Sequence, residues 1–240
     1  MTLVVDGRLT IPLYHGTSDL FYESIVAHGL GGRNIIKEMR AVELLGYLIS
    51  ICRDSLPYDE EWLVRMNVAE RIVRQGVTSG GFNLRHGSAY LTPSSFTAMN
   101  YATSNQYGSE ALEYVMQLWY RLRERDISVP RVVSDIAQPL IEFTARPRIP
   151  ILIKLEAVPA NILAAENGGD AANILQRLEE WREQMDDRLF FTMCQQENFE
   201  LLKPVPMGEA EVFQIVTSRE HQLSLEPYGA VTSYRRLVGN

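Results

Sequence analysis

Apolar residues recur at helical spacing through much of the first half of the chain. Between residues 34 and 53 they return every three or four positions, which predicts a helix with one buried face. A second helix is expected over about 60–74, with its apolar positions mainly on one side. Stretches bounded by glycine, proline or serine predict further helices at 19–28, 94–107, 109–125 and 170–186. Helices are therefore expected to make up much of the fold.

The strongest strand signal is the sequence IPILIKLEAV at 149–158, where β-branched and other apolar residues predict a buried strand. Shorter strands are expected between turn residues at 9–17, 88–92, 198–203, 211–217 and 221–226. The order is one strand, then helices, a strand, more helices and a late group of strands. This order predicts an α+β fold rather than regular βαβ alternation. We expect one domain over residues 1–240, with a helical insertion at about 31–80.

Composition places the chain among ordinary globular proteins, since 46% of its 240 residues are hydrophobic and 22% are charged. Its apolar runs fall short of the ~18 residues that span a bilayer, so no membrane partner is expected. The start, MTLVVDGRLTIPLYHG, has an early Asp and Pro and no basic region, unlike a signal peptide. We therefore expect a cytoplasmic protein, or one that a dedicated secretion system exports into a target cell.

Charge and metal-binding residues exclude some functions. The net charge of −7 and the pI of about 5.2 argue against a broad basic groove for duplex nucleic acid. Cys52 and Cys194 lie in apolar stretches, which predicts buried thiols. The four histidines and two cysteines lack H-x-x-x-H and C-x-x-C spacing, so no metal site is expected.

Three short motifs carry candidate chemistry. The first is Leu13-Tyr14-His15-Gly16-Thr17, where a strand meets a turn, followed by a helix that ends before Gly29-Leu30. The second is Gly87-Ser88-Ala89-Tyr90-Leu91-Thr92, followed by a helix that carries Tyr101. The third is Gly208-Glu209-Ala210-Glu211, a pair of carboxylates leading into an apolar strand. Taken singly, each motif also fits a structural histidine, core tyrosines or a solvated charge at a strand entry.

Together and in this order, the three motifs resemble the H-Y-E motifs of the ADP-ribosyltransferase superfamily, in its diphtheria-toxin and poly(ADP-ribose) polymerase branch. The likeness covers about 13–30, 87–102 and 208–217, and IPILIKLEAV resembles the family strand that follows the second motif. The resemblance implies a split, strongly bent mixed β-sheet with helical insertions. It also implies that NAD, as co-substrate, lies in a cleft between the halves of the sheet.

The resemblance assigns the first motif to NAD binding. His15 would hydrogen-bond a ribose hydroxyl on the adenosine side of NAD, and the Gly16 backbone would hold the nicotinamide carboxamide. Thr17 stands where the family often has Ser. Tyr90 and Tyr101 would sandwich the nicotinamide ring, whose positive charge attracts aromatic faces.

The third motif would supply the catalytic carboxylate. Glu211 would hydrogen-bond the 2′-hydroxyl of the nicotinamide ribose and stabilise the oxocarbenium-like charge that develops as nicotinamide leaves. On one strand, Glu209 and Glu211 would point to the same face, so spacing leaves both open. We prefer Glu211 because it directly precedes the apolar strand, and we place Glu209 among the NAD-binding residues. Ala98 departs from the polymerase-like pattern, which has a Ser there to hold the carboxamide.

The expected function is therefore that of an NAD-dependent mono-ADP-ribosyltransferase with His15, Tyr90 and Glu211 as catalytic residues. Its acceptor would be a protein or a nucleic acid, and residues 31–86 would face the acceptor or a partner. The protein would be a toxin, an effector or an antiviral defence protein, with an antitoxin or immunity protein as partner. The alternatives are a module that binds NAD or ADP-ribose without transferase activity, and an enzyme similar to RNA 2′-phosphotransferases.

Overall fold

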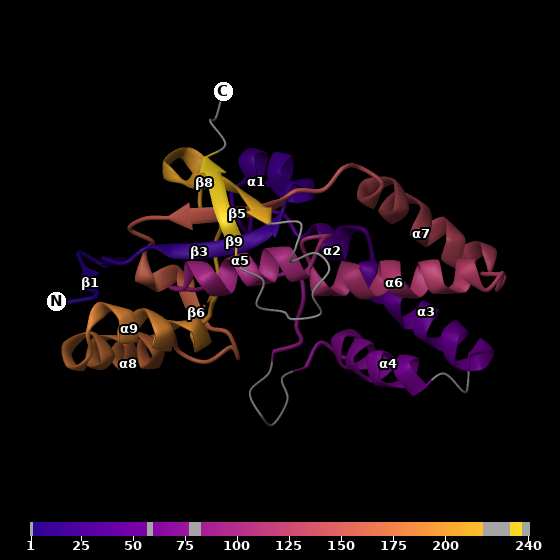
Figure 1. Ribbon diagram of the computed structural model, residues 1–240, viewed down its shortest axis with the longest axis horizontal. Helices are drawn as coiled ribbons and strands as arrows, with labels where there is room; N and C mark the ends of the chain where they lie inside the picture. Colours follow the sequence, from indigo (N-terminus) through magenta and orange to yellow (C-terminus); the bar gives the residue numbers. More distant parts are fainter. Residues whose placement is uncertain (1, 57–59, 77–82, 218–230, 237–240) are drawn as a thin grey trace. The chain divides into compact units, whose positions relative to one another are not determined.

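The computed structural model describes residues 2–56, 60–76, 83–217 and 231–236 (Figure 1). The contacts between residues divide the chain into two compact units. We call the first the sheet unit; it comprises residues 1–33, 88–108 and 148–240. The second, the helical unit, comprises residues 34–87 and 109–147, so the insertion expected at about 31–80 falls mostly within it.

The main sheet of the sheet unit has four antiparallel strands in the order β3-β5-β8-β9. They are β3 (Leu13–Ser18), β5 (Pro150–Leu155), β8 (Glu211–Thr217) and β9 (Val231–Arg236). The strand expected at 149–158 is thus confirmed as β5, the neighbour of both β3 and β8. The strand expected at 221–226 lies outside the described residues.

A second, three-stranded sheet has the order β4-β7-β6. Its strands are β4 (Tyr90–Leu91), β7 (Phe199–Leu201) and β6 (Leu163–Ala165). A bridge between Tyr14 and Thr92 connects β3 to the residue that follows β4. A small hairpin of β1 (Val4–Val5) and β2 (Arg8–Leu9) precedes both sheets. Every strand pair in the described residues is antiparallel, so the expectation of a mixed sheet was wrong.

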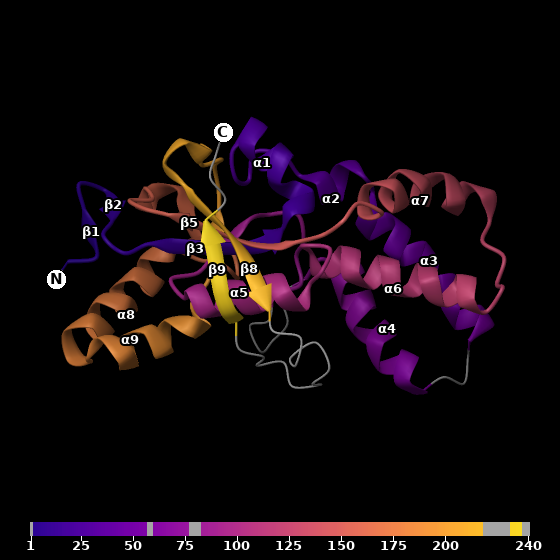
Figure 2. The same ribbon diagram turned by 45° about the horizontal axis from the view of Figure 1, so that its top comes forward.

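The two faces of the main sheet are covered differently. Side chains alternate along a strand, and Leu152 and Ile215 pack with Ala98 and Ala102 of helix α5 (Ser95–Ser104) on one face (Figures 1 and 2). The opposite face contributes to the larger core, which also contains residues of the second sheet. Its members include Leu13, Ile151, Ile153, Val212, Leu91, Phe199 and Phe190.

The other helices of the sheet unit are short or lie at its periphery. They are α1 (Tyr22–His28), α8 (Ala171–Gln184) and α9 (Asp187–Met193), with 3₁₀ turns η1 (Asp19–Phe21), η2 (Ala160–Ile162), η3 (Cys194–Gln196) and η4 (Met207–Glu209). The helix predicted at 19–28 therefore begins as a 3₁₀ turn. Ser94 caps α5 by accepting a hydrogen bond from the Thr97 amide.

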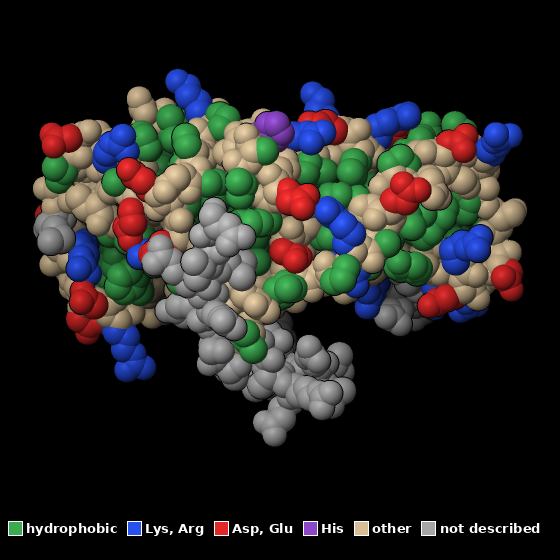
Figure 3. All heavy atoms as spheres, turned by 90° about the horizontal axis from the view of Figure 1, so that it is seen from above, with side chains coloured by type: hydrophobic (Ala, Val, Ile, Leu, Met, Phe, Trp, Pro, Cys, Tyr) green, Lys and Arg blue, Asp and Glu red, His purple; other side chains and the backbone are tan. Residues whose placement is uncertain are grey.

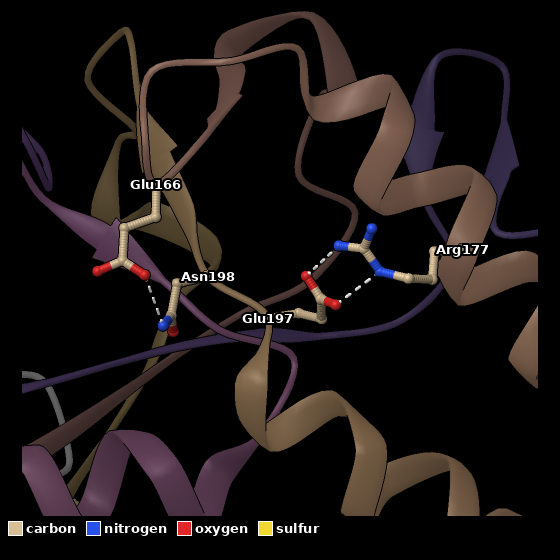
Figure 4. A network of polar contacts seen from close by, with 4 residues as sticks. All are labelled: Glu166, Arg177, Glu197 and Asn198. Atoms are coloured by element: carbon tan, nitrogen blue, oxygen red, sulfur yellow. Dashed lines mark hydrogen bonds and ion pairs between the residues drawn. The ribbon is translucent and has the colours of Figure 1, made fainter. Parts of the chain in front are cut away.

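A polar network joins α8 to the strands of the second sheet (Figure 4). Arg177 of α8 donates two hydrogen bonds of 2.8 Å to Glu197, whose side chain is only 10% exposed. The next residue, Asn198, donates to Glu166 at 2.9 Å. This Arg177–Glu197 pair ties the helix to the segment that enters β7.

The helical unit contains α2 (Ile35–Glu38), α3 (Ala41–Ser55), α4 (Glu60–Val73), α6 (Glu110–Glu124) and α7 (Arg131–Thr144). Helix α3 packs against α4, α6 and α7. The prediction of a single helix over 34–53 was wrong, because the helical conformation is interrupted between α2 and α3. Arg40 there has a left-handed backbone with φ of 54°, which ends regular helical hydrogen bonding.

Two further sequence predictions can be compared with the structure. Both Cys52 and Cys194 are free and buried, as expected, and burial raises the pKa of their thiols to about 11 and about 12. Across the described ranges, no helix has both the length and the apolar character needed to cross a lipid bilayer. The observed architecture is α+β.

Candidate functional site

His15 lies on β3 with its ring turned toward the residue that begins β4. The imidazole Nδ1 is 2.8 Å from the Tyr90 carbonyl oxygen. A carbonyl oxygen can only accept a hydrogen bond, so Nδ1 carries the proton and donates it. In the neutral ring, Nε2 is then a hydrogen-bond acceptor.

The protonation state of His15 follows from its surroundings. Desolvation of the half-buried ring lowers the imidazole pKa from its ordinary value, and the hydrogen bond to Tyr90 opposes this only in part. The ring is therefore neutral near pH 7. Nε2 presents a lone pair, which suits a hydroxyl group that donates.

Gly16 follows His15 at a place where no side chain fits. A Cβ atom added there would lie 1.7 Å from the carbonyl oxygen of Ala98 on α5. Glycine is thus required by the close approach of helix and strand.

The backbone of Gly16 faces the edge of β3 that does not pair with β5. Tyr14 exchanges backbone hydrogen bonds of 2.8 and 3.0 Å with Thr92, on the side away from β5. Peptide groups two residues apart on a strand point to the same side, so the N–H and C=O of Gly16 point to this edge too. Such an edge can bind a planar amide through one donor and one acceptor.

The hydroxyl groups near this edge have structural roles. Thr17 is buried, and its Oγ1 donates to the Gly108 carbonyl oxygen at 3.1 Å. Thr97 of α5 donates to the Gln195 carbonyl oxygen, also at 3.1 Å. The resemblance places Thr17 among the NAD-binding residues, but its hydroxyl hydrogen is already donated to the Gly108 carbonyl oxygen within the fold.

The two tyrosines of the second motif lie on separate elements. Tyr90 begins β4 and is half-buried, and its carbonyl accepts the His15 hydrogen bond. Tyr101 lies near the end of α5 and is 40% exposed. The strand-then-helix arrangement expected for this motif is confirmed. Its function as an aromatic slot stays a prediction.

Glu211 is the first residue of β8 and pairs with Lys154 on β5. Lys154 Nζ lies 3.2 Å from Glu211 Oε2 and 2.6 Å from Glu156 Oε1. Hydrogen bonds to Glu156 and then to Glu211 raise the Lys154 pKa to about 12, so its ammonium stays charged. The site therefore includes a cation that was not singled out in the sequence, although Lys154 is the one charged residue within 149–155.

Glu209 does not share the strand of Glu211. It ends the 3₁₀ turn η4 and is exposed. The expectation that the two carboxylates lie on one strand and face the same side was wrong, because alternation begins only at Glu211. Glu211 is the one with a described strand partner.

Strand register determines which face each candidate occupies. In one row across the sheet, His15 of β3 pairs with Ile153 of β5, which pairs with Val212 of β8. In the adjacent row, Tyr14 pairs with Lys154, which pairs with Glu211. Directly paired residues point to the same face and adjacent rows to opposite faces. His15 and Glu211 therefore point to opposite faces of the main sheet. Gly16 lies on β3, the strand at the edge of this sheet, so its backbone borders both faces.

Comparisons with known proteins add no assignment: the sequence matches no protein-family model and no curated protein, and the structure matches no solved structure.

Charged side chains are mixed on the surface shown in Figure 3. Lys and Arg alternate with Asp and Glu across the described residues in that view, without a continuous basic stripe. The net charge of −7 fits this distribution. The arrangement gives no support to a broad electrostatic footprint for duplex nucleic acid.

Proposed function

We propose that this chain is an NAD-dependent mono-ADP-ribosyltransferase that cleaves the nicotinamide–ribose bond and transfers ADP-ribose to a protein or a nucleic acid. The observation that carries the proposal is the 2.8 Å contact between His15 Nδ1 and the Tyr90 carbonyl oxygen. It joins two of the three motifs across 75 residues of sequence. The third motif begins the strand next to β5, on the same sheet as His15.

NAD binding is proposed to follow the edge of β3. The nicotinamide carboxamide would exchange hydrogen bonds with the Gly16 peptide groups, while Tyr90 and Tyr101 contact the ring. A ribose hydroxyl on the adenosine side would donate to His15 Nε2, the acceptor in the neutral ring. A dinucleotide that crosses this edge would contact His15 on one face and would extend past β5 to reach Glu211 on the other.

The proposed reaction exchanges one bond at the ribose C1′ atom for another. The C1′–N bond breaks and its electron pair leaves with nicotinamide, which becomes neutral. Glu211 stabilises the positive charge that develops on the ribose through the 2′-hydroxyl. An acceptor nucleophile attacks C1′ from the opposite face and loses a proton.

The test compares Glu211→Gln with Glu209→Gln, which makes the same chemical change two residues away. Glu211→Gln removes a preorganised charge, so nicotinamide release and ADP-ribose transfer should both fall by ~10²-fold or more. Glu209→Gln should reduce transfer more than NAD cleavage, because Glu209 lies on the exposed turn before the strand. Release is measured by chromatography, and transfer by mass spectrometry of macromolecules incubated with NAD.

Two outcomes would contradict this assignment. Loss of cleavage in Glu209→Gln with full cleavage in Glu211→Gln would make Glu209 the central carboxylate. No nicotinamide release from the folded wild-type protein would remove the transferase function altogether. Melting temperatures establish that each variant is folded.

A second candidate is a module that binds NAD or ADP-ribose without catalysis. One observation favours it: Ala98 supplies no hydroxyl, and that of the adjacent Thr97 is bonded to Gln195. In that case NAD raises the melting temperature of the wild-type protein without releasing nicotinamide.

The proposed setting is that of a toxin, an effector or a defence enzyme. It would act in the cytoplasm, or in a target cell after export, and would be controlled by an antitoxin or immunity protein.

A further inference from the structure

Lys154 occupies a central place among the polar residues of the main sheet. It lies on β5, with β3 on one side and β8 on the other. Tyr14 is its register partner on β3, and Glu211 is its partner on β8. Its side chain is 24% exposed, so it is more enclosed than most surface lysines.

Two carboxylates share the Lys154 ammonium. Glu156 directly follows the end of β5 and has an oxygen 2.6 Å from Nζ. The Glu211 contact is longer, at 3.2 Å, and uses Oε2. Glu156 is 51% exposed and Glu211 is 31% exposed. The ammonium thus contacts both carboxylates, and the more exposed one, Glu156, is at the shorter distance.

Such an arrangement restricts the Glu211 side chain. A lone exposed ion pair contributes little stability, because two long side chains must be ordered. Here the lysine stem rises from a central strand, and Glu156 already orders its end. The remaining effect of the contact is to limit the rotamers of Glu211 and to fix the direction in which its carboxylate points.

We propose that Lys154 is a positioning residue for Glu211, with Glu156 as the anchor that holds the lysine in place. The inference rests on the proposed function, since it concerns the carboxylate assigned to the nicotinamide ribose. Lys154 acts through Glu211 and not on NAD itself. Its removal therefore affects the rate of bond cleavage and leaves NAD affinity nearly unchanged.

A double-mutant cycle tests this coupling. Lys154→Met keeps the length and apolar stem of the side chain but removes its charge. In the wild-type background this substitution should lower kcat for nicotinamide release by about tenfold, which corresponds to ~1.4 kcal/mol, within the range for coupled neighbours. In the Glu211→Gln background the same substitution should have no further effect, because the carboxylate that it orients is already gone.

Two more variants separate positioning from general damage. Lys154→Arg keeps the charge and should retain most of kcat, and Glu156→Gln should lower kcat by a smaller factor than Lys154→Met. Arg177→Met, which breaks a different ion pair of the same unit, serves as the control for lost stability and should leave kcat unchanged. The Kd for NAD, measured by calorimetry, should stay within about twofold of wild type for each Lys154 variant.

The outcomes are distinguishable. Equal losses of kcat from Lys154→Met in both backgrounds, or no loss in either, would overturn the positioning role while wild-type activity upholds the proposed function. A weaker NAD affinity with unchanged kcat would likewise overturn it. No nicotinamide release from wild type would overturn the proposed function, and this inference with it.

Discussion

Gly16 is a residue whose identity follows from one contact. The Ala98 carbonyl oxygen occupies the position that a side chain would need. Gly16→Ala should therefore push α5 away from β3 and lower the free energy of unfolding by about 1–3 kcal/mol, the usual cost of overpacking. Gly208→Ala is the matched control, since a Cβ there meets nothing within 4 Å. Urea unfolding of both variants measures the difference. Equal free energies of unfolding would show that α5 moves away from β3 without loss of stability.

His86 predicts an acid-sensitive contribution to stability. Its Nε2 is buried and lacks a hydrogen-bond partner among the described residues, and burial lowers its pKa from 6.5 to about 4. As the pH falls, the unfolded chain takes up the proton first. The contribution of neutral His86 to the free energy of unfolding is therefore complete above pH 6.5 and is lost between pH 6.5 and about pH 4. His86→Gln should therefore show a smaller loss of unfolding free energy than wild type between pH 7 and pH 4.5. His15 is present in both proteins, so its own lowered pKa does not affect the comparison. Parallel pH profiles would mean that His86 is not the group responsible.

At the scale of elements, local patterns and long-range pairing differ in how far the sequence predicts them. Apolar periodicity predicted the helices that the structure has as α3 and α4, because such spacing reflects a single buried face. The break at Arg40 was missed, since apolar spacing continues through it. The three-residue strand β6 was also missed, because so short a segment has no measurable period and pairs with β7 far along the chain.

The candidate site shows the same limit. The order of the motifs led to His15, Tyr90 and Glu211 as candidates, which stay a prediction, and the structure adds the His15–Tyr90 contact. The pairing of Lys154 with Glu211 depends on the register between strands 57 residues apart, which composition and spacing do not encode. The prediction that Glu209 faces the same side as Glu211 was wrong because Glu209 lies in a 3₁₀ turn, where side chains do not alternate as they do along a strand.

The Arg177–Glu197 pair predicts how firmly α8 is attached to the second sheet. Arg177→Met leaves the nearly buried Glu197 carboxylate without its forked partner. The free energy of unfolding should fall by about 1–2 kcal/mol, less than for a fully buried pair because Arg177 is itself 44% exposed. Arg131→Met is the control, since Arg131 and Asp135 are 95% and 70% exposed and should contribute less than ~0.5 kcal/mol. Similar losses of unfolding free energy in the two variants would mean that the Arg177–Glu197 pair stabilises the fold no more than an exposed pair.

At the scale of the whole molecule, the seven residues predicted for the site all lie in the sheet unit. They are His15, Gly16, Thr17, Tyr90, Tyr101, Glu209 and Glu211. If the proposed function holds, expression of the wild-type chain should slow growth of the host, because NAD is consumed or a macromolecule is modified. His15→Ala should relieve this effect, whereas His28→Ala, an exposed histidine of α1, should not. Growth curves at matched protein levels provide the measurement, and undiminished slowing by folded His15→Ala would contradict an enzymatic cause.

The segment 202–210, which leads into Glu211, is held by its backbone. Leu202 donates to the Ile162 carbonyl at 2.8 Å, and Leu30 and Val205 exchange hydrogen bonds of 2.8 and 3.0 Å. Most of its side chains are exposed and take no part in these bonds. Sequence drift along this segment can therefore alter what it presents to other molecules without moving the start of β8. In this chain, the surface that segment 202–210 presents can therefore change while the carboxylate proposed for catalysis, Glu211, stays in place.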